Sequence, residues 1–117
     1  GSSSWFKSGY ITYSNEAKHT LLGVSEQTLI DYGAVSKPVV EQMALGAAQA
    51  ANANMAVSVS GIAGPDGGSA KKPVGTVCFG FAVNGEVSTH CQCFSGDRHQ
   101  VREQAIEFAL QQLLALC

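Results

Sequence analysis

The segment from Met55 to Gly68 constrains this chain most, because an alternating stretch runs directly into a glycine-rich loop. Valine and serine alternate up to Ser60, which is the two-residue period of a β-strand with two unequal faces. Gly61 ends the expected strand and opens a loop of glycines around Pro65. Backbone N–H groups in such a loop are able to approach an anion or a phosphate ester closely, because glycine has no Cβ. An ordinary tight loop between two strands has the same pattern, so both interpretations stay open.

Helices and strands alternate on both sides of this loop. The Asn84-Gly85 pair predicts a tight hairpin between two adjacent antiparallel strands. The pattern favours a three-layer α/β/α domain with a mixed sheet that contains this hairpin. The strands are expected over 9–13, 55–61, 74–83 and 86–94, and the helices over 14–23, 25–32, 36–53 and 98–116.

Composition and charge exclude several classes of function. The 117 residues fit one domain, and a net charge of −2 without a basic run argues against a nucleic-acid partner. No Gly-Lys-Ser/Thr sequence opens a helix after the loop, which excludes a Walker-type phosphate site. No apolar run approaches the roughly 18 residues of a membrane helix. We therefore expect a soluble protein with a small-molecule ligand, and no membrane partner.

The cysteines and histidines do not form a metal-binding set. Cys91 and Cys93 are separated by one residue on an expected strand, which is not the spacing of a zinc motif. A chain with 45% apolar residues does not need a disulfide framework. The sequence therefore predicts no metal, and free thiols in a reducing cytoplasm.

Lys18 is expected in the first turn of the helix that begins at Ser14 or Asn15. A cation there opposes the helix dipole, at a cost of a few tenths of a kcal/mol, and the same field favours the neutral amine. Such a local misfit is typical of a functional lysine. The alternative is a solvated surface lysine whose charge is offset by Glu16.

Arg102 is expected near the top of the buried stripe of the last helix, one turn before Ile106. It either extends from the edge of the core into water or points into a pocket. The N-terminus of this helix is a further anion site by geometry. The expected apolar set is Val101, Ala105, Ile106, Ala109, Leu110, Leu113, Leu114 and Leu116.

Five blocks of sequence, taken together, resemble the C-terminal domain of the CinA family of competence/damage-inducible proteins. They occur in order and cover nearly the whole chain, so 1–117 is expected to be a single CinA C-terminal-like domain. The blocks are 9–18, 33–36, 60–68, 72–76 and 94–102.

The resemblance implies that the protein is a nicotinamide mononucleotide amidohydrolase, which converts this nucleotide and water to nicotinic acid mononucleotide and ammonia in pyridine nucleotide salvage. It implies a serine nucleophile and no metal or other cofactor. The family's tyrosine and lysine match Tyr13 and Lys18, and its arginine matches Arg102. The glycine-rich loop would face the nucleotide through Gly61, Ile62, Ala63, Gly64 and Pro65.

One departure from the family pattern concerns the nucleophile. The family's serine lies in a Glu-Ser-Cys-Thr-Gly-Gly motif that this sequence does not contain. We expect the chain to begin about forty residues into the domain, without its first strand and helix. The exposed sheet edge would favour a homo-oligomer. The alternative function is a nucleotide-binding or assembly domain without turnover.

Overall fold

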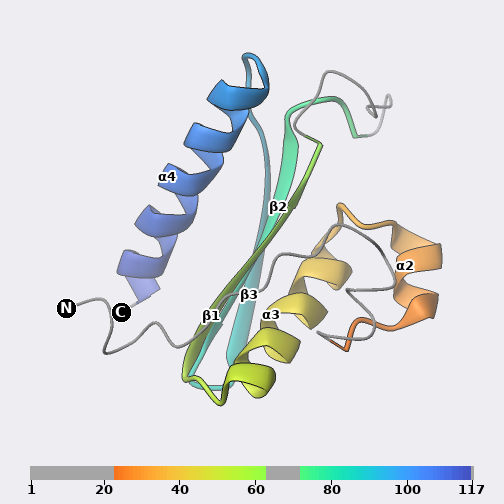
Figure 1. Cartoon of the computed structure of the whole chain (residues 1–117), viewed down its shortest axis with the longest axis vertical. Helices are drawn as coiled ribbons and strands as arrows, with labels where there is room; N and C mark the ends of the chain where they lie inside the picture. The colour runs from red at the N-terminus through yellow and green to blue at the C-terminus, as the bar shows by residue number, and fades with distance from the viewer. Residues whose placement is uncertain (1–22, 63–71, 117) are drawn as a thin grey trace.

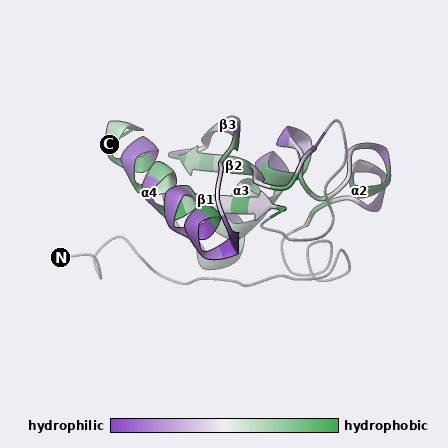
Figure 2. Cartoon of the chain, turned by 90° about the horizontal axis from the view of Figure 1, so that it is seen from above, coloured by the Kyte–Doolittle hydropathy of each residue, from purple (hydrophilic) through white to green (hydrophobic). Residues whose placement is uncertain are grey.

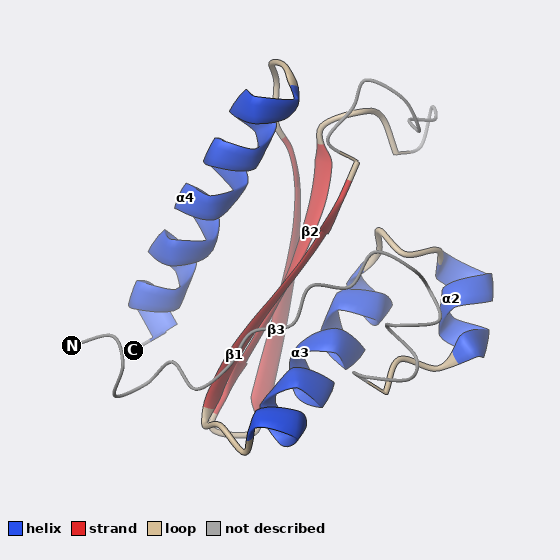
Figure 3. Cartoon of the chain, in the orientation of Figure 1, coloured by secondary structure: helices blue, strands red, loops and turns tan. Residues whose placement is uncertain are grey.

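A three-stranded antiparallel sheet forms the centre of the fold in the computed structural model, which describes residues 23–62 and 72–116 (Figure 1). The strands are β1 (Met55–Gly61), β2 (Thr76–Val83) and β3 (Glu86–Cys93), in the order β1-β2-β3. Helix α4 (Arg98–Leu116) covers one face, and α3 (Lys37–Ala51) covers the other with α2 (Glu26–Tyr32) beside it (Figure 3). The expected three layers are confirmed. Every pairing among the described strands is antiparallel, and the strand expected over 9–13 lies outside the described residues.

Short-range capping explains where the two helices on the α3 side begin and end. The Ser25 hydroxyl accepts a hydrogen bond from the Thr28 N–H at 3.0 Å and caps α2, which ends at Gly33 with a φ of 77°. Pro38 stands in the first turn of α3, where its missing N–H costs nothing. Asn52 caps α3 in the left-handed conformation, so the helix ends at Ala51, two residues before the expected end at 53.

The Asn84-Gly85 hairpin is confirmed. Both residues have positive φ values, 52° and 86°, as a two-residue type I′ turn requires. The turn pairs Val83 with Glu86 and so fixes the register of β2 on β3. Strand β2 begins at Thr76 rather than at 74, because Pro73 to Thr76 form a turn in which the Thr76 N–H donates to the Pro73 carbonyl at 3.0 Å.

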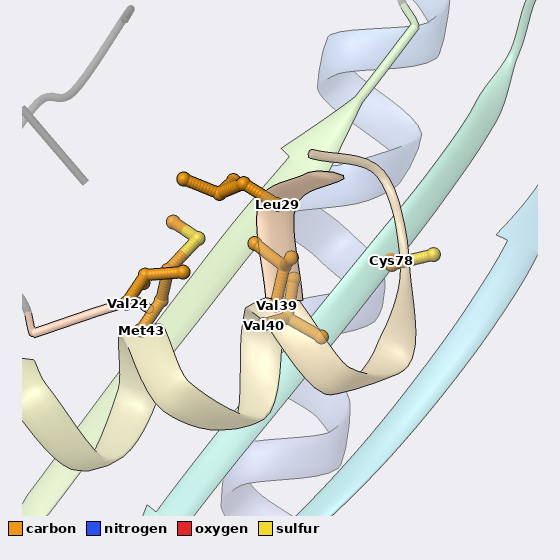
Figure 4. Close-up of a cluster of buried hydrophobic side chains, with 6 residues drawn as sticks. All are labelled: Val24, Leu29, Val39, Val40, Met43 and Cys78. Carbon is orange, nitrogen blue, oxygen red and sulfur yellow. The ribbon is translucent and has the colours of Figure 1, made fainter. Parts of the chain in front are cut away.

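Strand β2 carries core residues on both of its faces. One cluster lies between the sheet and α4, where Phe79 stacks near Phe81 and meets Phe108 at a ring-centroid distance of 4.7 Å. The other cluster lies against α3 and includes Met43 (Figure 4). A central strand buried on both faces anchors the two helical layers to one sheet. This second cluster contains Val24, Leu29, Val39, Val40, Met43 and Cys78.

Helix α3 approaches the sheet closely at Gly80. A Cβ at residue 80 would overlap the Val40 carbonyl of α3 and the Ser58 hydroxyl of β1. That hydroxyl donates to the Val40 carbonyl at 2.6 Å, so the buried serine is satisfied. The serine face of β1 is therefore the buried one, while Val59 on the opposite face is 45% exposed.

The prediction of free thiols is wrong for two of the described cysteines. Cys78 and Cys91 form a disulfide bond, and Cys93 is a free, exposed thiol. The cause is the hairpin register, which places Cys78 directly opposite Cys91 in the antiparallel pair. Composition, on which the prediction of free thiols rested, contains no information about this register.

In the absence of a reductant, Cys91→Ser is expected to lower the free energy of unfolding by about 2 kcal/mol. The reason is that the Cys78–Cys91 disulfide constrains the unfolded chain, and the variant lacks it. We place the loss at the lower end of the usual range, since the two strands are already hydrogen-bonded neighbours. Urea denaturation measures it, with Cys93→Ser as the matched control. Equal stability of Cys91→Ser and the unmodified protein would contradict the expectation, and a reductant should abolish most of the difference.

Candidate functional site

Three of the five sequence blocks meet at the end of the sheet where β1 leads into the glycine-rich loop. The Gly75 N–H donates to the Ile62 carbonyl at 2.6 Å, and the Phe94 N–H donates to the Gly75 carbonyl at 2.9 Å. The Ile62 N–H donates to the Thr76 carbonyl at 2.8 Å. We call these four residues, Ile62, Gly75, Thr76 and Phe94, the Gly75 junction. It closes the base of the loop and ties that base to the segment that leads into α4.

Glycine is required at residue 75. Its φ is +98°, and a Cβ there would overlap the backbone of Phe94. Gly61 has a different constraint, because a Cβ would lie 2.8 Å from the Val77 Cγ2 atom and 3.2 Å from the Thr76 carbonyl. Packing within the sheet is therefore sufficient to explain why residue 61 is a glycine, without a ligand close to its backbone.

A fourth block reaches the same region through Lys72. The Lys72 Nζ donates to the Tyr32 carbonyl at the end of α2, at 2.7 Å and across 40 residues of sequence. Gly33 follows immediately, and its carbonyl accepts the Ser36 hydroxyl at 2.8 Å. The turn from 33 to 36 is thus held from within by Ser36 and joined to the Gly75 side of the loop by Lys72.

The N-terminus of α4, expected to be an anion site, is already occupied by the chain itself. The Asp97 carboxylate accepts the Gln100 N–H at 2.9 Å, and the Gln100 side-chain oxygen accepts the Asp97 N–H at 2.8 Å. This is a reciprocal capping box, which places a negative side chain where a bound anion would sit. The interpretation of this terminus as a phosphate site is therefore wrong for the described arrangement.

Helix α4 begins at the end of the sheet where β1 ends and β2 begins (Figure 1), and Arg102 lies in its second turn. It is exposed, and the prediction that it stands near the top of a buried stripe is wrong, because Ile106 is 58% exposed. Apolar and polar positions are mixed along α4 (Figure 2), and the helix contacts the sheet along a narrower line than the sequence suggested. The residues on this line are Val101, Ala105, Phe108, Ala109 and Leu113. Leu110, Leu114 and Leu116 of the expected set are exposed as well.

The remaining predicted site residues lie outside the described residues. These are Tyr13, Lys18, Ala63, Gly64 and Pro65. Their convergence on one pocket stays a prediction.

Sequence reasoning gave no role to Lys72 or Gly75, although both belong to a quoted block. An isolated glycine at the start of an expected strand indicates a close backbone approach, and this signal was available for Gly75. No local pattern pairs Lys72 with a carbonyl 40 residues away.

Two shallow depressions of about 430 and 380 Å³ lie at the Asn84-Gly85 end of the sheet and contact none of the described candidate residues. Within 23–62 and 72–116, no group of three or more His, Cys, Asp or Glu side chains is placed to hold a metal ion. No helix in that part of the chain has the length and hydropathy needed to cross a membrane.

Comparison with known proteins identifies the family. The model of the CinA C-terminal domain matches residues 1–117. The chain is 67% identical over 115 residues to the nicotinamide-nucleotide amidohydrolase PncC of Enterobacter agglomerans, covering 97% of this chain and 70% of that protein. It is 62% identical over 114 residues to PncC of Escherichia coli K12, covering 97% of this chain and 69% of that protein.

Solved structures agree with this result. The crystal structure of the competence or damage-inducible protein from Enterobacter asburiae superposes with a TM-score of 0.86 at 42% identity. The match covers 90% of this chain and 66% of that one, so this chain spans slightly less than two thirds of the solved protein. The whole-chain match and the shared fold lead to one conclusion: the chain belongs to the CinA C-terminal domain family.

Proposed function

We propose that the protein is a nicotinamide-nucleotide amidohydrolase that converts nicotinamide mononucleotide and water to nicotinic acid mononucleotide and ammonia. The observation that carries the proposal is the 67% identity, over 97% of the chain, to a relative with this name. The hydrogen bonds that join three family blocks at one end of the sheet support it, together with the bond from Lys72 to Tyr32, the residue next to a fourth block. Several loops that meet at one end of a sheet offer a ligand contacts from more than one segment at once.

Lys18 acts in the proposed reaction as the general base. The hydroxyl of a serine attacks the carboxamide carbon, and its proton passes to the neutral amine of Lys18. The C–N bond then breaks, and Lys18 returns the proton to the departing ammonia. Water hydrolyses the acyl-enzyme ester by the same proton route and releases the carboxylate product. Tyr13 lies five residues before Lys18 and is proposed to orient the base.

Arg102 is proposed to stabilise negative charge, either on the substrate phosphate or on the oxygen of the tetrahedral intermediate. Its exposure at the Gly75 end of the sheet is consistent with contact to a ligand that lies outside the core. The backbone from Gly61 through Ile62, Ala63 and Gly64 to Pro65 is proposed to face the nucleotide. No metal or other cofactor takes part in this proposal.

The nucleophile is proposed to lie in a Glu-Ser-Cys-Thr-Gly-Gly segment encoded before residue 1, together with the first strand and helix of the domain. We further propose a cytoplasmic location, which follows from the role in nucleotide salvage. Self-association is part of the same proposal, supported by the exposed apolar side chains Ile106, Leu110 and Leu114 on α4.

Ammonia release by the full-length protein tests the proposal. We expect ammonia and nicotinic acid mononucleotide to form in equal amounts from nicotinamide mononucleotide. Free nicotinamide carries the same amide without the ribose phosphate, and it should react far more slowly because the nucleotide contacts are lost. Binding of the nucleotide without ammonia release would favour the alternative, a binding or assembly domain without turnover.

A further inference from the structure

The Lys72 side chain joins the segment that follows the glycine-rich loop to the end of α2. The Lys72 Nζ lies 2.7 Å from the Tyr32 carbonyl oxygen, and a Cβ on Gly33 would lie 3.5 Å from the same nitrogen. Lys72 is half-buried at this position. The lysine thus lies directly over the point where α2 ends and the 33–36 turn begins.

The C-terminus of α2 requires a partner of this kind. The last carbonyls of a helix have no donor within the helix, and the dipole places partial negative charge there. The Leu29 carbonyl accepts the Gly33 N–H at 3.0 Å, and the Tyr32 carbonyl accepts Lys72. The last turn of α2 contains no basic residue of its own. Lys72 supplies the missing cation from the far side of the glycine-rich loop.

The segment from Lys72 to Thr76 is fixed at its other end by backbone hydrogen bonds. Gly75 is bonded to Ile62 and to Phe94, and the Thr76 hydroxyl donates to the Pro73 carbonyl at 2.7 Å. These bonds do not involve the lysine side chain, so they persist without it. Loss of the Lys72 ammonium would therefore remove this tie to α2 and leave the Gly75 junction in place.

We propose that Lys72 is a positioning residue for the amidohydrolase site. Its ammonium holds the 33–36 turn in a fixed relation to the Gly75 junction, so that both are in place when the nucleotide binds. The inference rests on the proposed function, because it assigns to this end of the sheet the recognition of the substrate. Lys72 acts through the segments that it joins, and it takes no part in the chemical step.

Lys72→Met in the full-length protein tests this role, because methionine keeps much of the side-chain length and removes the charge and the donors. We expect the KM for nicotinamide mononucleotide to rise about tenfold while kcat stays within about threefold, since a charge-assisted hydrogen bond that organises binding is lost. In Lys72→Arg, the KM should stay close to that of the unmodified protein, because a guanidinium N–H can also donate to the Tyr32 carbonyl. Lys37→Met, a change at an exposed lysine at the start of α3, is the matched control.

Amide hydrogen exchange provides a measurement that does not depend on activity. In Lys72→Met, exchange at Gly33 should be faster than in the unmodified protein, and Lys72→Arg and Lys37→Met should leave it unchanged. An unchanged KM in Lys72→Met, or a fall in kcat without a change in KM, would overturn the inference. If the unmodified protein releases no ammonia, the proposed function is wrong. If, in addition, amide exchange at Gly33 is the same in Lys72→Met and the unmodified protein, then Lys72 does not hold the 33–36 turn in place either.

Discussion

Ammonia release from nicotinamide mononucleotide should fall by at least a hundredfold when Lys18 is replaced by alanine in the full-length protein. A positioned general base contributes about 10² to 10⁴ in rate, and alanine leaves no group to accept the proton of the nucleophile. Binding of the nucleotide, measured by calorimetry, should remain detectable because the loop and Arg102 are unchanged. A loss of turnover with retained binding is the pattern expected for a residue that acts on the chemical step.

Lys37→Ala serves as the control for Lys18→Ala, because it removes an exposed lysine from the first turn of α3. It should change the rate less than about twofold, as is usual for surface substitutions. Activity of Lys18→Ala within about threefold of the unmodified protein would remove Lys18 from the mechanism. It would favour the interpretation of this residue as a solvated surface lysine.

Gly75→Ala is expected to lower the free energy of unfolding by about 4 kcal/mol. A non-glycine residue in the left-handed region costs about 1 to 2 kcal/mol, and forcing a methyl group into an occupied space adds about 1 to 3 kcal/mol. Here the methyl group would overlap the backbone of Phe94, which cannot move without breaking its hydrogen bond to Gly75. Urea denaturation followed by circular dichroism measures the loss.

Gly85→Ala separates the two parts of this cost. Gly85 has a φ of +86°, close to the +98° of Gly75, but no atom lies within 4 Å of its ideal Cβ position. It should therefore lose only the conformational part, about 1 kcal/mol. Equal losses in the two variants would show that the overlap with Phe94 contributes nothing, and the role of Gly75 as the centre of the junction would be wrong.

Local sequence chemistry was sufficient to predict most of the fold. The type I′ turn at Asn84-Gly85, the caps at Ser25 and Asn52 and the long last helix are all encoded by residues close to one another in the chain. Such features depend on backbone geometry and short-range hydrogen bonds. They are therefore visible before any tertiary contact is known.

The disulfide could have been predicted from the hairpin and was not. Once the turn pairs Val83 with Glu86, five further steps along each strand bring Cys78 opposite Cys91. The prediction of free thiols relied on composition, which contains no register. Register is set by the turn, and it decides which side chains meet.

Side-chain exposure on α4 and β1 depended on tertiary packing that the sequence did not contain. Ile106 fits a helical apolar stripe, yet it is 58% exposed, because the sheet contacts α4 along Val101 and Ala105. In β1 the valine face is the more exposed one, because α3 approaches on the serine side, where Gly80 leaves room. Hydrophobic pattern alone does not identify which face meets a neighbour.

The roles of the candidate site residues stay predictions. Gly61 ends β1, Ile62 follows it, and Arg102 lies in the second turn of α4. The roles of Lys72 and Gly75 were missed because each depends on a partner far away in sequence, the Tyr32 carbonyl and the Phe94 backbone. Convergence of Tyr13 and Lys18 stays a prediction.

We propose that residues 1–117 belong to a serine amidohydrolase and that its nucleophile lies in a Glu-Ser-Cys-Thr-Gly-Gly segment outside these residues. The most direct measurement is ammonia release from nicotinamide mononucleotide by two samples in parallel, residues 1–117 alone and the same residues preceded by their upstream coding sequence. We predict activity only in the longer protein, and loss of that activity when the serine of the Glu-Ser-Cys-Thr-Gly-Gly motif is replaced by alanine. Ammonia release by residues 1–117 alone would contradict the placement of the nucleophile, and the absence of ammonia release in both samples would contradict the assignment as an amidohydrolase.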